Sequence, residues 1–290
     1  MWHNRYRNIA VVAPAGPSPR DKVEAGVRLL EAQGKHVRVM PHVFAGASRP
    51  YLAAEAEARA ADLTSAWLDP ATDLILAVRG GFGSAHILPL LDWEKLRTRK
   101  IPVVGYSDIT ALHFAMLRKR AGIAVAAPMA AKLPEAMADA YTAQEMEAAF
   151  ARSRTRTLAM PANRQLRMLR PGYLRAKVIA ANLAVAATLC GTPYLPRTRG
   201  RLVILEDLNE APYKVDRYLT QLAQSGFFEG CAGIAFGSLL DCGKETELEP
   251  VLRQALDWTA GPVAAGFPFG HEFPMMSLNF EQFIEFGGGQ

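Results

Sequence analysis

The sequence has 290 residues, of which half are hydrophobic, and its 33 Lys and Arg residues against 28 Asp and Glu residues give a formal net charge of +5. This length exceeds what one hydrophobic core usually organises, so two domains are predicted. The basic residues are scattered and lack interleaved aromatic residues, which argues against nucleic-acid binding. No apolar stretch is long enough to span a membrane, and the first one, residues 9–13, is too short for a signal peptide.

The number and spacing of the cysteines indicate the cellular compartment of the protein. Cys190, Cys231 and Cys242 are odd in number and lack the spacing of metal ligands. This pattern favours free thiols in a reducing compartment over a disulfide framework or a structural metal site. We therefore expect a cytoplasmic protein.

Short apolar strands alternate with amphipathic helices in the first half of the chain. Strands are predicted at residues 9–13, 36–40, 74–78, 101–104 and 123–127, and helices at 19–33, 51–68, 87–96 and 109–122. Such repeated units indicate a parallel sheet covered by helices on both faces. A flavodoxin-like strand order, 2-1-3-4-5, would place ligands at the carboxyl ends of the strands, near the reversal of the order.

Ser107 lies on the turn between the predicted strand 101–104 and the next helix. Such a turn raises a side-chain oxygen above the sheet edge and directs free helical N–H groups at the same point, which suits a nucleophile beside an oxyanion site. The alternative is that Ser107 or Asp108 only caps the helix. The loops at residues 14–16 and 80–81 are expected at the same edge, which favours a functional Ser107.

The glycine pair Gly80-Gly81 follows the predicted third strand. It is either a flexible turn with positive φ or a loop whose backbone N–H groups approach a ligand without an intervening side chain. A phosphate-binding loop is not indicated, because neither the Walker pattern nor the full G-x-G-x-x-G fingerprint is present.

The character of the sequence changes over residues 151–171, where arginines alternate with small and polar residues. We predict a solvated linker here, because charge runs are weak evidence for an anion-binding patch. The predicted N-terminal domain therefore covers residues 1–150 and the C-terminal domain covers residues 172–290. The arginines of this run are Arg152, Arg154, Arg156, Arg164, Arg167 and Arg170.

In the second half, residues 174–189 are apolar nearly all round, which predicts a buried helix. Further strands are predicted at residues 202–205, 233–239 and 263–267, and helices at 213–222 and 248–259. Glu206 directly follows one of these strands, and His271 follows another. Each has a structural alternative, because a carboxylate after a strand often caps the next helix and a single histidine carries little information.

Seven short motifs occur in order along the chain: RGGFG at 79–83, GYSDIT at 105–110, NLAV at 182–185, GTP at 191–193, LEDLNE at 205–210, DR at 216–217 and FGHE at 269–272. Together this set resembles the LD-carboxypeptidase family, the muramoyltetrapeptide carboxypeptidases, which are serine peptidases. The resemblance implies an α/β protein whose flavodoxin-like, parallel-sheet N-terminal domain carries the nucleophile. It also implies a smaller, β-rich α/β C-terminal domain, with the active site in the groove between the two.

Within this resemblance the family's nucleophilic serine matches Ser107, its glutamate matches Glu206 and its histidine matches His271. A free hydroxyl is a poor nucleophile at neutral pH until an imidazole accepts its proton. Glu206 would hold His271 in the required tautomer and stabilise the imidazolium. We expect the backbone N–H groups of Gly81 and Asp108 to form the oxyanion hole.

An exopeptidase must also bind the free carboxylate of its substrate. We expect this contact from Arg79 with the neighbouring Gly80, or from the helix N-terminus at Gly83 and Ser84. The implied substrate is a cytoplasmic murein tetrapeptide, which loses its terminal D-alanine during wall recycling. The resemblance implies a homodimer that uses no metal and no organic cofactor. The alternatives are an immunity peptidase that cleaves peptide–nucleotide antibiotics with the same triad, and a non-catalytic module that binds a small ligand.

Two positions depart from the family pattern. Ala181 stands where relatives commonly have glycine, and residues 273–279 replace a proline–glycine strand that helps to shape the groove in relatives. The second departure bears on which substrates the groove accepts.

Overall fold

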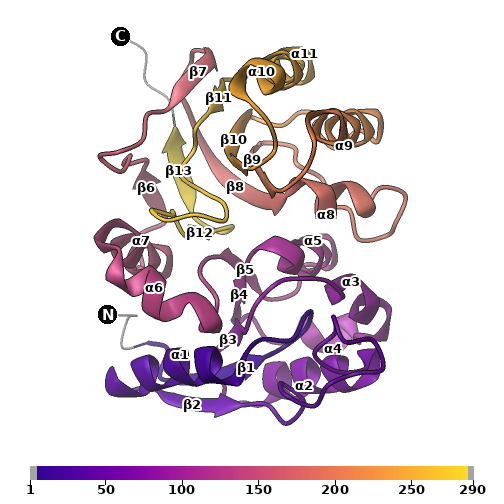
Figure 1. Ribbon diagram of the computed structural model, residues 1–290, viewed down its shortest axis with the longest axis vertical. Helices are drawn as coiled ribbons and strands as arrows, with labels where there is room; N and C mark the ends of the chain where they lie inside the picture. Colours follow the sequence, from indigo (N-terminus) through magenta and orange to yellow (C-terminus); the bar gives the residue numbers. More distant parts are fainter. Residues whose placement is uncertain (1–4, 287–290) are drawn as a thin grey trace.

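The computed structural model describes residues 5–286 and holds two β-sheets, one above the other in Figure 1. Within these residues the first sheet runs β12-β5-β4-β3-β1-β2. Its five N-terminal strands are parallel and follow the predicted order 2-1-3-4-5, which is confirmed. The strands are β1 (Asn8–Val12), β2 (His36–Val39), β3 (Leu74–Ala77), β4 (Pro102–Gly105), β5 (Ile123–Ala126) and β12 (Leu278–Asn279).

Helices cover the first sheet in two groups. One group places α1 against α6, and the other places α2 against α3 and α4. Strands β3 and β4 are buried along their whole length, as expected for a sheet covered on both faces. The helices of this half are α1 (Arg20–Ala32), α2 (Ala56–Leu68), α3 (Ser84–Ile87), α4 (Trp93–Leu96), α5 (Thr110–Lys119), α6 (Leu133–Ala138) and α7 (Ala140–Phe150).

The single helix predicted at residues 87–96 is wrong, because the segment divides into α3, a 3-10 turn at Leu88–Leu90 and α4. Pro89 lies in the first turn of the 3-10 segment, where its missing N–H does no harm. Asp92 then begins α4 as a cap whose carboxylate accepts a hydrogen bond from the Lys95 backbone N–H at 3.2 Å. Two helix starts within a few residues leave no room for one continuous helix.

The second sheet runs β6-β13-β8-β9-β10-β11-β7 within the described residues. Its four central strands are mutually parallel, while β13 and β7 pair antiparallel at the two sides. The strands are β6 (Thr155–Thr157), β7 (Arg167–Arg170), β8 (Leu174–Asn182), β9 (Arg201–Leu208), β10 (Gly233–Leu240), β11 (Val263–Ala265) and β13 (Phe283–Phe286). The helices are α8 (Leu183–Thr188), α9 (Pro212–Gln224), α10 (Glu245–Arg253) and α11 (Ala255–Trp258), and no described helix has the length and apolarity of a membrane span.

The buried helix predicted at residues 174–189 is also wrong, because most of this segment is the strand β8 and only its end forms α8. The first part of β8 alternates buried Leu174, Ala176 and Val178 with the more exposed Arg175 and Lys177, which is the period of a strand. The remainder, residues 179–182, is buried throughout and pairs with β9, so its apolar run has no period to separate strand from helix.

The predicted linker at residues 151–171 contributes β6 and β7 to the second sheet. Arg152 and Arg154 are exposed, as predicted, but the other four arginines are partly buried, which corrects the prediction for them. Arg156 forms an ion pair with Glu145 in which each side chain is only 9% exposed, and Arg164 pairs with Glu272 at 3.1 Å. Arg170 donates to the backbone carbonyl of Leu256 at 2.7 Å.

The C-terminal part of the chain returns to the first sheet. Strand β12 pairs antiparallel with β5, so the sequence from 278 to 279 extends the N-terminal sheet. The preceding segment is held by the Met275 N–H, which donates to the Thr142 hydroxyl on α7 at 2.9 Å. The unusual tail at residues 273–279 therefore joins the two halves of the molecule. In Figure 1 these halves also meet where α5 lies beside α8.

Candidate active site

Ser107 occupies a constrained turn between β4 and α5. It begins the 3-10 turn Ser107–Ile109 with φ of 61°, a left-handed conformation that costs a non-glycine residue about 1–3 kcal/mol. Gly105, at the end of β4, permits this turn because a Cβ atom there would lie 2.8 Å from Ile109 Cγ1. The backbone strain of this turn therefore lies at Ser107, the predicted nucleophile.

The glycine loop lies directly against this turn. A Cβ atom on Gly80 would lie 2.9 Å from the Ser107 Oγ atom and 2.8 Å from its Cβ, so only glycine fits. The Gly80 carbonyl accepts a hydrogen bond from the Gly16 N–H at 3.0 Å, which ties in the first loop as well. The three loops that the sequence placed at one edge therefore meet around Ser107.

Asp108 connects the same turn to α3. Its buried carboxylate accepts a hydrogen bond from the Ser84 N–H at 2.8 Å, and burial raises its pKa despite this bond. The Ser84 N–H is therefore already engaged, which disfavours the predicted carboxylate contact at the helix N-terminus of Gly83 and Ser84 and favours the one at Arg79. The described hydrogen bonds leave the backbone N–H groups of Gly81 and Asp108 without an acceptor, as an oxyanion hole requires.

Arg59 is a buried support of this edge that the sequence did not reveal. Only 2% of it is exposed, and its guanidinium donates to the carbonyls of Gly83 and Ala54, each at 2.8 Å. It sits on α2, where an alanine- and glutamate-rich pattern gave no sign that an arginine points inward. Its role depends on loops far apart in sequence, which no local pattern encodes.

Glu206 and His271 form a hydrogen-bonded pair in the second half of the molecule. The Glu206 Oε2 atom on β9 lies 2.7 Å from His271 Nδ1, and Glu206 has no exposed surface. Burial raises the pKa of Glu206. Burial lowers the pKa of His271, but the hydrogen bond and charge of Glu206 outweigh this effect and raise it overall. Because an ionised carboxylate only accepts hydrogen bonds, Nδ1 carries the proton and Nε2 is left as the basic nitrogen.

Asn182 and Asp207 form a second layer behind the pair. The Asn182 side-chain amide donates to Asp207 Oδ1 at 2.8 Å and lies 3.4 Å from Glu206 Oε1. Asp207 also accepts the Ala184 N–H at 2.9 Å, so it is fixed to the start of α8. Both residues lie within motifs that the sequence singled out, but their roles require the pairing of β8 with β9.

Ser107 and His271 line the same cavity, which has a volume of about 280 Å³. The Tyr106 ring lies 5.1 Å from the His271 ring, and Glu206 supports the imidazole from behind. The predicted substrate residues Arg79 and Gly80 and the predicted oxyanion residue Gly81 also line this cavity. Its remaining lining includes Lys22 and Lys132 but no carboxylate, so the cavity favours an anionic ligand, although Lys132 also pairs with Glu135 at 2.6 Å.

The described residues hold no cluster of three or more His, Cys, Asp and Glu side chains that could bind a metal ion. The three cysteines are free thiols.

Two family models match most of the chain. The LD-carboxypeptidase N-terminal domain matches residues 9–127, and the LD-carboxypeptidase C-terminal domain matches residues 175–286. A Streptomyces coelicolor protein that carries the name of a carboxypeptidase, SCO6489, is 39% identical over 91% of this chain and 84% of its own length. The murein tetrapeptide carboxypeptidase of Pseudomonas aeruginosa is 31% identical over 93% of this chain and 90% of its own length.

Solved structures share the fold at lower sequence identity. The structure of an MccF-like protein from Bacillus anthracis superposes with a TM-score of 0.88 at 21% identity, covering 100% of this chain and 96% of the other. At this identity the match establishes the fold alone. The two domain matches and the relatives above show that the chain belongs to the LD-carboxypeptidase family.

Proposed function

We propose that the protein is a serine LD-carboxypeptidase that releases the terminal D-alanine from murein tetrapeptides. The observation that carries this proposal is the hydrogen bond between Glu206 and His271 behind a cavity that His271 shares with Ser107. The name of the Pseudomonas aeruginosa relative supports murein tetrapeptide as the substrate.

The proposed reaction begins when Ser107 Oγ attacks the carbonyl carbon of the L,D peptide bond while His271 Nε2 accepts the hydroxyl proton. The N–H groups of Gly81 and Asp108 stabilise the resulting oxyanion, and one such donor contributes about 3–4 kcal/mol. The imidazolium, stabilised by Glu206, then gives its proton to the departing D-alanine amine. This step leaves an ester between Ser107 and the tripeptide.

The ester is then hydrolysed by the same groups in reverse roles. Neutral His271 takes a proton from a water molecule, whose oxygen attacks the ester carbonyl. The second tetrahedral intermediate collapses when the proton passes from His271 to Ser107 Oγ. The tripeptide leaves with a new carboxylate, and the enzyme returns to its starting state.

The cations of the cavity suit the carboxylate of the terminal D-alanine. The Arg79 guanidinium lies beside Gly81, within 3.6 Å of where a Cβ atom on that glycine would be, and donates to the Pro17 carbonyl at 3.1 Å. A guanidinium keeps further donors when one is engaged, so Arg79 can also bind a carboxylate. Gly80 lines the same cavity, so its backbone can contact the same carboxylate.

The direct test incubates the purified protein with murein tetrapeptide and measures free D-alanine. We expect release by the wild type, no release by Ser107→Ala, and tetrapeptide binding by both. Binding without release by the wild type would instead identify a non-catalytic binding module.

The rival substrate class is a peptide–nucleotide antibiotic. It is favoured by the MccF-like fold, and MccF itself is named a microcin C7 self-immunity protein. We propose the murein substrate because the Pseudomonas relative, at 31% identity, is more similar than Escherichia coli MccF, at 24%. A side-by-side assay with aspartyl sulfamoyl adenosine, which is bound in one solved MccF structure, decides, and faster cleavage of the nucleotide than of the tetrapeptide would reject our proposal.

We further propose that the enzyme acts in the cytoplasm as a homodimer. The three free thiols suit a reducing compartment. Light scattering on the eluting protein tests the dimer, and fractionation of cells that express the natural protein tests the compartment. A monomeric mass or recovery outside the cytoplasmic fraction would contradict the respective statement.

A further inference from the structure

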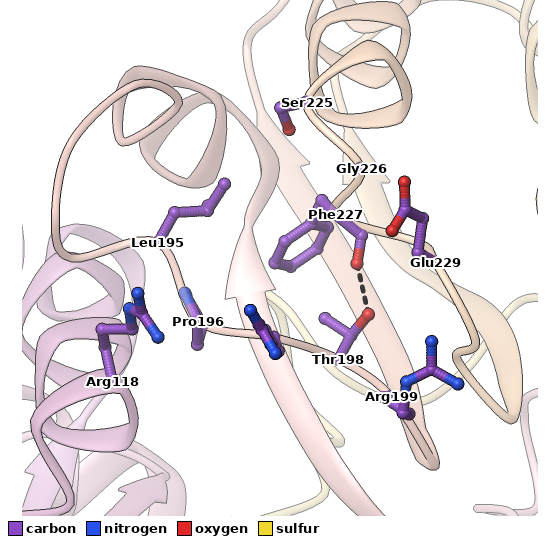
Figure 2. A pocket seen from close by; sticks show the side chains of 10 residues that line it. Arg118, Leu195, Pro196, Thr198, Arg199, Ser225, Gly226, Phe227 and Glu229 are labelled. Carbon is purple, nitrogen blue, oxygen red and sulfur yellow. Dashed lines mark hydrogen bonds between the residues drawn. The ribbon is translucent and has the colours of Figure 1, made fainter.

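A second cavity lies at the seam between the two halves, with a volume of about 390 Å³ (Figure 2). It shares no lining residue with the cavity around Ser107. Arg118 on α5 forms one side, and the chain segment 195–199 and the turn 225–229 form the other. A ligand here would therefore touch both halves at once.

Three guanidinium groups line this cavity, those of Arg118, Arg197 and Arg199. Among the described residues none of them makes a hydrogen bond, an ion pair or a cation–π contact. All three are exposed residues, as are Arg152 and Arg154, but they differ from those two in lining one cavity. Glu229 is the sole carboxylate in the lining, and no ion pair within 4.0 Å joins it to the three arginines.

The backbone holds Arg197 and Arg199 on the same side. Thr198 between them is 1% exposed, and its hydroxyl donates to the Phe227 carbonyl, the dashed line in Figure 2. In an extended segment alternate side chains point to opposite faces, so burying Thr198 presents both arginines outward. The Arg201 N–H, which donates to the Thr198 carbonyl at 2.9 Å, fixes the segment further.

Helix α5, which carries Arg118 on the other side of the cavity, packs against the same part of the second half. The rings of Phe114 on α5 and Phe227 stack with their centroids 5.6 Å apart, across the seam and next to the cavity. Lys119, one residue beyond Arg118, lies over the Tyr194 ring at 5.6 Å. These contacts hold the helix that carries Arg118 against the segments that form the other side of the cavity.

We propose that this cavity binds a small molecule through a diphosphate group. A carboxylate can satisfy one guanidinium, whereas three of them present more paired N–H donors than one carboxylate can accept. Two linked phosphoryl groups supply enough acceptor oxygens and enough negative charge for all three arginines. The volume leaves room for a diphosphate and part of what it is attached to.

Titration calorimetry at constant ionic strength tests the site with inorganic pyrophosphate, ADP and adenosine as probes. We expect pyrophosphate and ADP to bind and adenosine not to bind. Tighter binding of ADP than of pyrophosphate would identify a nucleotide as the ligand, and equal binding would identify the diphosphate alone. Binding of neither pyrophosphate nor ADP, or equal binding of adenosine, would overturn the proposal.

Variants then locate the binding. Arg197→Ala/Arg199→Ala should weaken pyrophosphate binding by at least about tenfold. Arg152→Ala/Arg154→Ala is the matched control, since it removes two exposed arginines at the same spacing and changes the net charge equally. An equal loss in both double variants would show that overall charge, and not this cavity, attracts the anion.

Two further variants keep the test decisive if the double alanine variant does not fold. Arg118→Ala, from the opposite wall, should also weaken binding, whereas Glu229→Gln should strengthen it about two- to fivefold by removing the carboxylate of the lining. Unchanged affinity in both single variants would refute the site. Circular dichroism of the unliganded proteins confirms that each variant is folded.

Discussion

The ionisation of one imidazole sets the pH range of the proposed reaction. His271 must be neutral to accept the Ser107 proton, and the charge and hydrogen bond of Glu206 hold its pKa above the ordinary value. Activity should therefore fall as the pH decreases through this raised pKa. In Glu206→Gln the charge is lost, so the acidic limb of kcat/KM should move to lower pH and its plateau should fall on the order of 10⁴-fold.

The pH profile of kcat/KM for both proteins measures this effect. The shift of the limb separates an electrostatic role of Glu206 from a merely structural one, because partial unfolding lowers the plateau without moving the limb. A limb that stays in place would contradict the pairing of Glu206 with the catalytic base.

A substitution of Arg79 distinguishes an effect on substrate binding from an effect on the chemical step. If it contacts only the substrate carboxylate, Arg79→Ala should raise KM for the tetrapeptide about tenfold and change kcat little. Arg152→Ala, an exposed arginine outside the cavity, serves as the control. An unchanged KM in Arg79→Ala would remove this side chain from the proposed binding site.

The sequence predicted the candidate catalytic residues at strand ends, but it did not predict the residues that hold them in place. Ser107, Glu206 and His271 each follow a predicted strand, the position where an α/β sheet usually carries its functional side chains. Ser107 belongs to the first sheet and Glu206 to the second, so strand order within one sheet does not predict that they approach each other. Asn182 and Asp207 touch only because β8 pairs with β9 in one register, and the sequence pattern had assigned β8 to a helix. Arg59 donates to the carbonyls of Pro14 and Gly83, which lie in loops that precede and follow it by many residues. These supports depend on tertiary structure that no local pattern records.

At the scale of elements, strand β6 is fastened to α7 by a buried ion pair. Arg156 and Glu145 are each 9% exposed along their side chains, and Arg156 also donates to the Ser277 carbonyl at 2.8 Å. Burial raises the pKa of Glu145 although Arg156 counteracts this effect. The predicted linker is therefore a structural part of the fold, and the sequence missed it because three- and four-residue strands carry little periodicity.

Arg156→Met should lower the free energy of unfolding by about 3–5 kcal/mol at neutral pH, because the Glu145 carboxylate would stay buried without its partner. The loss should shrink at lower pH, where Glu145 takes up a proton and its buried charge disappears. Denaturant unfolding at two pH values measures both effects. The double variant Glu145→Met/Arg156→Met should recover most of the stability, and a double variant as unstable as Arg156→Met would contradict this account.

At the scale of the whole molecule, the two halves are joined directly behind the site. The Asn182 N–H donates to the Thr110 hydroxyl at 2.9 Å, which links the start of α5, just after Ser107, to the end of β8 beside Glu206. The tail adds a second connection, since β12 extends the first sheet while β13 lies in the second. We expect these connections to make the two halves unfold in one transition.

Thr110→Val tests this junction with little change of shape. Both partners are buried, so the variant leaves the Asn182 N–H without an acceptor and should cost about 1–3 kcal/mol, or roughly 2–10 °C in Tm. It should also lower kcat, because Asn182 donates into the network that holds Glu206. Thr110→Ser keeps the hydroxyl and should retain most of both properties. A valine variant as stable and active as the wild type, with losses in the serine variant alone, would show that the methyl group, and not the hydrogen bond across the junction, matters at this position.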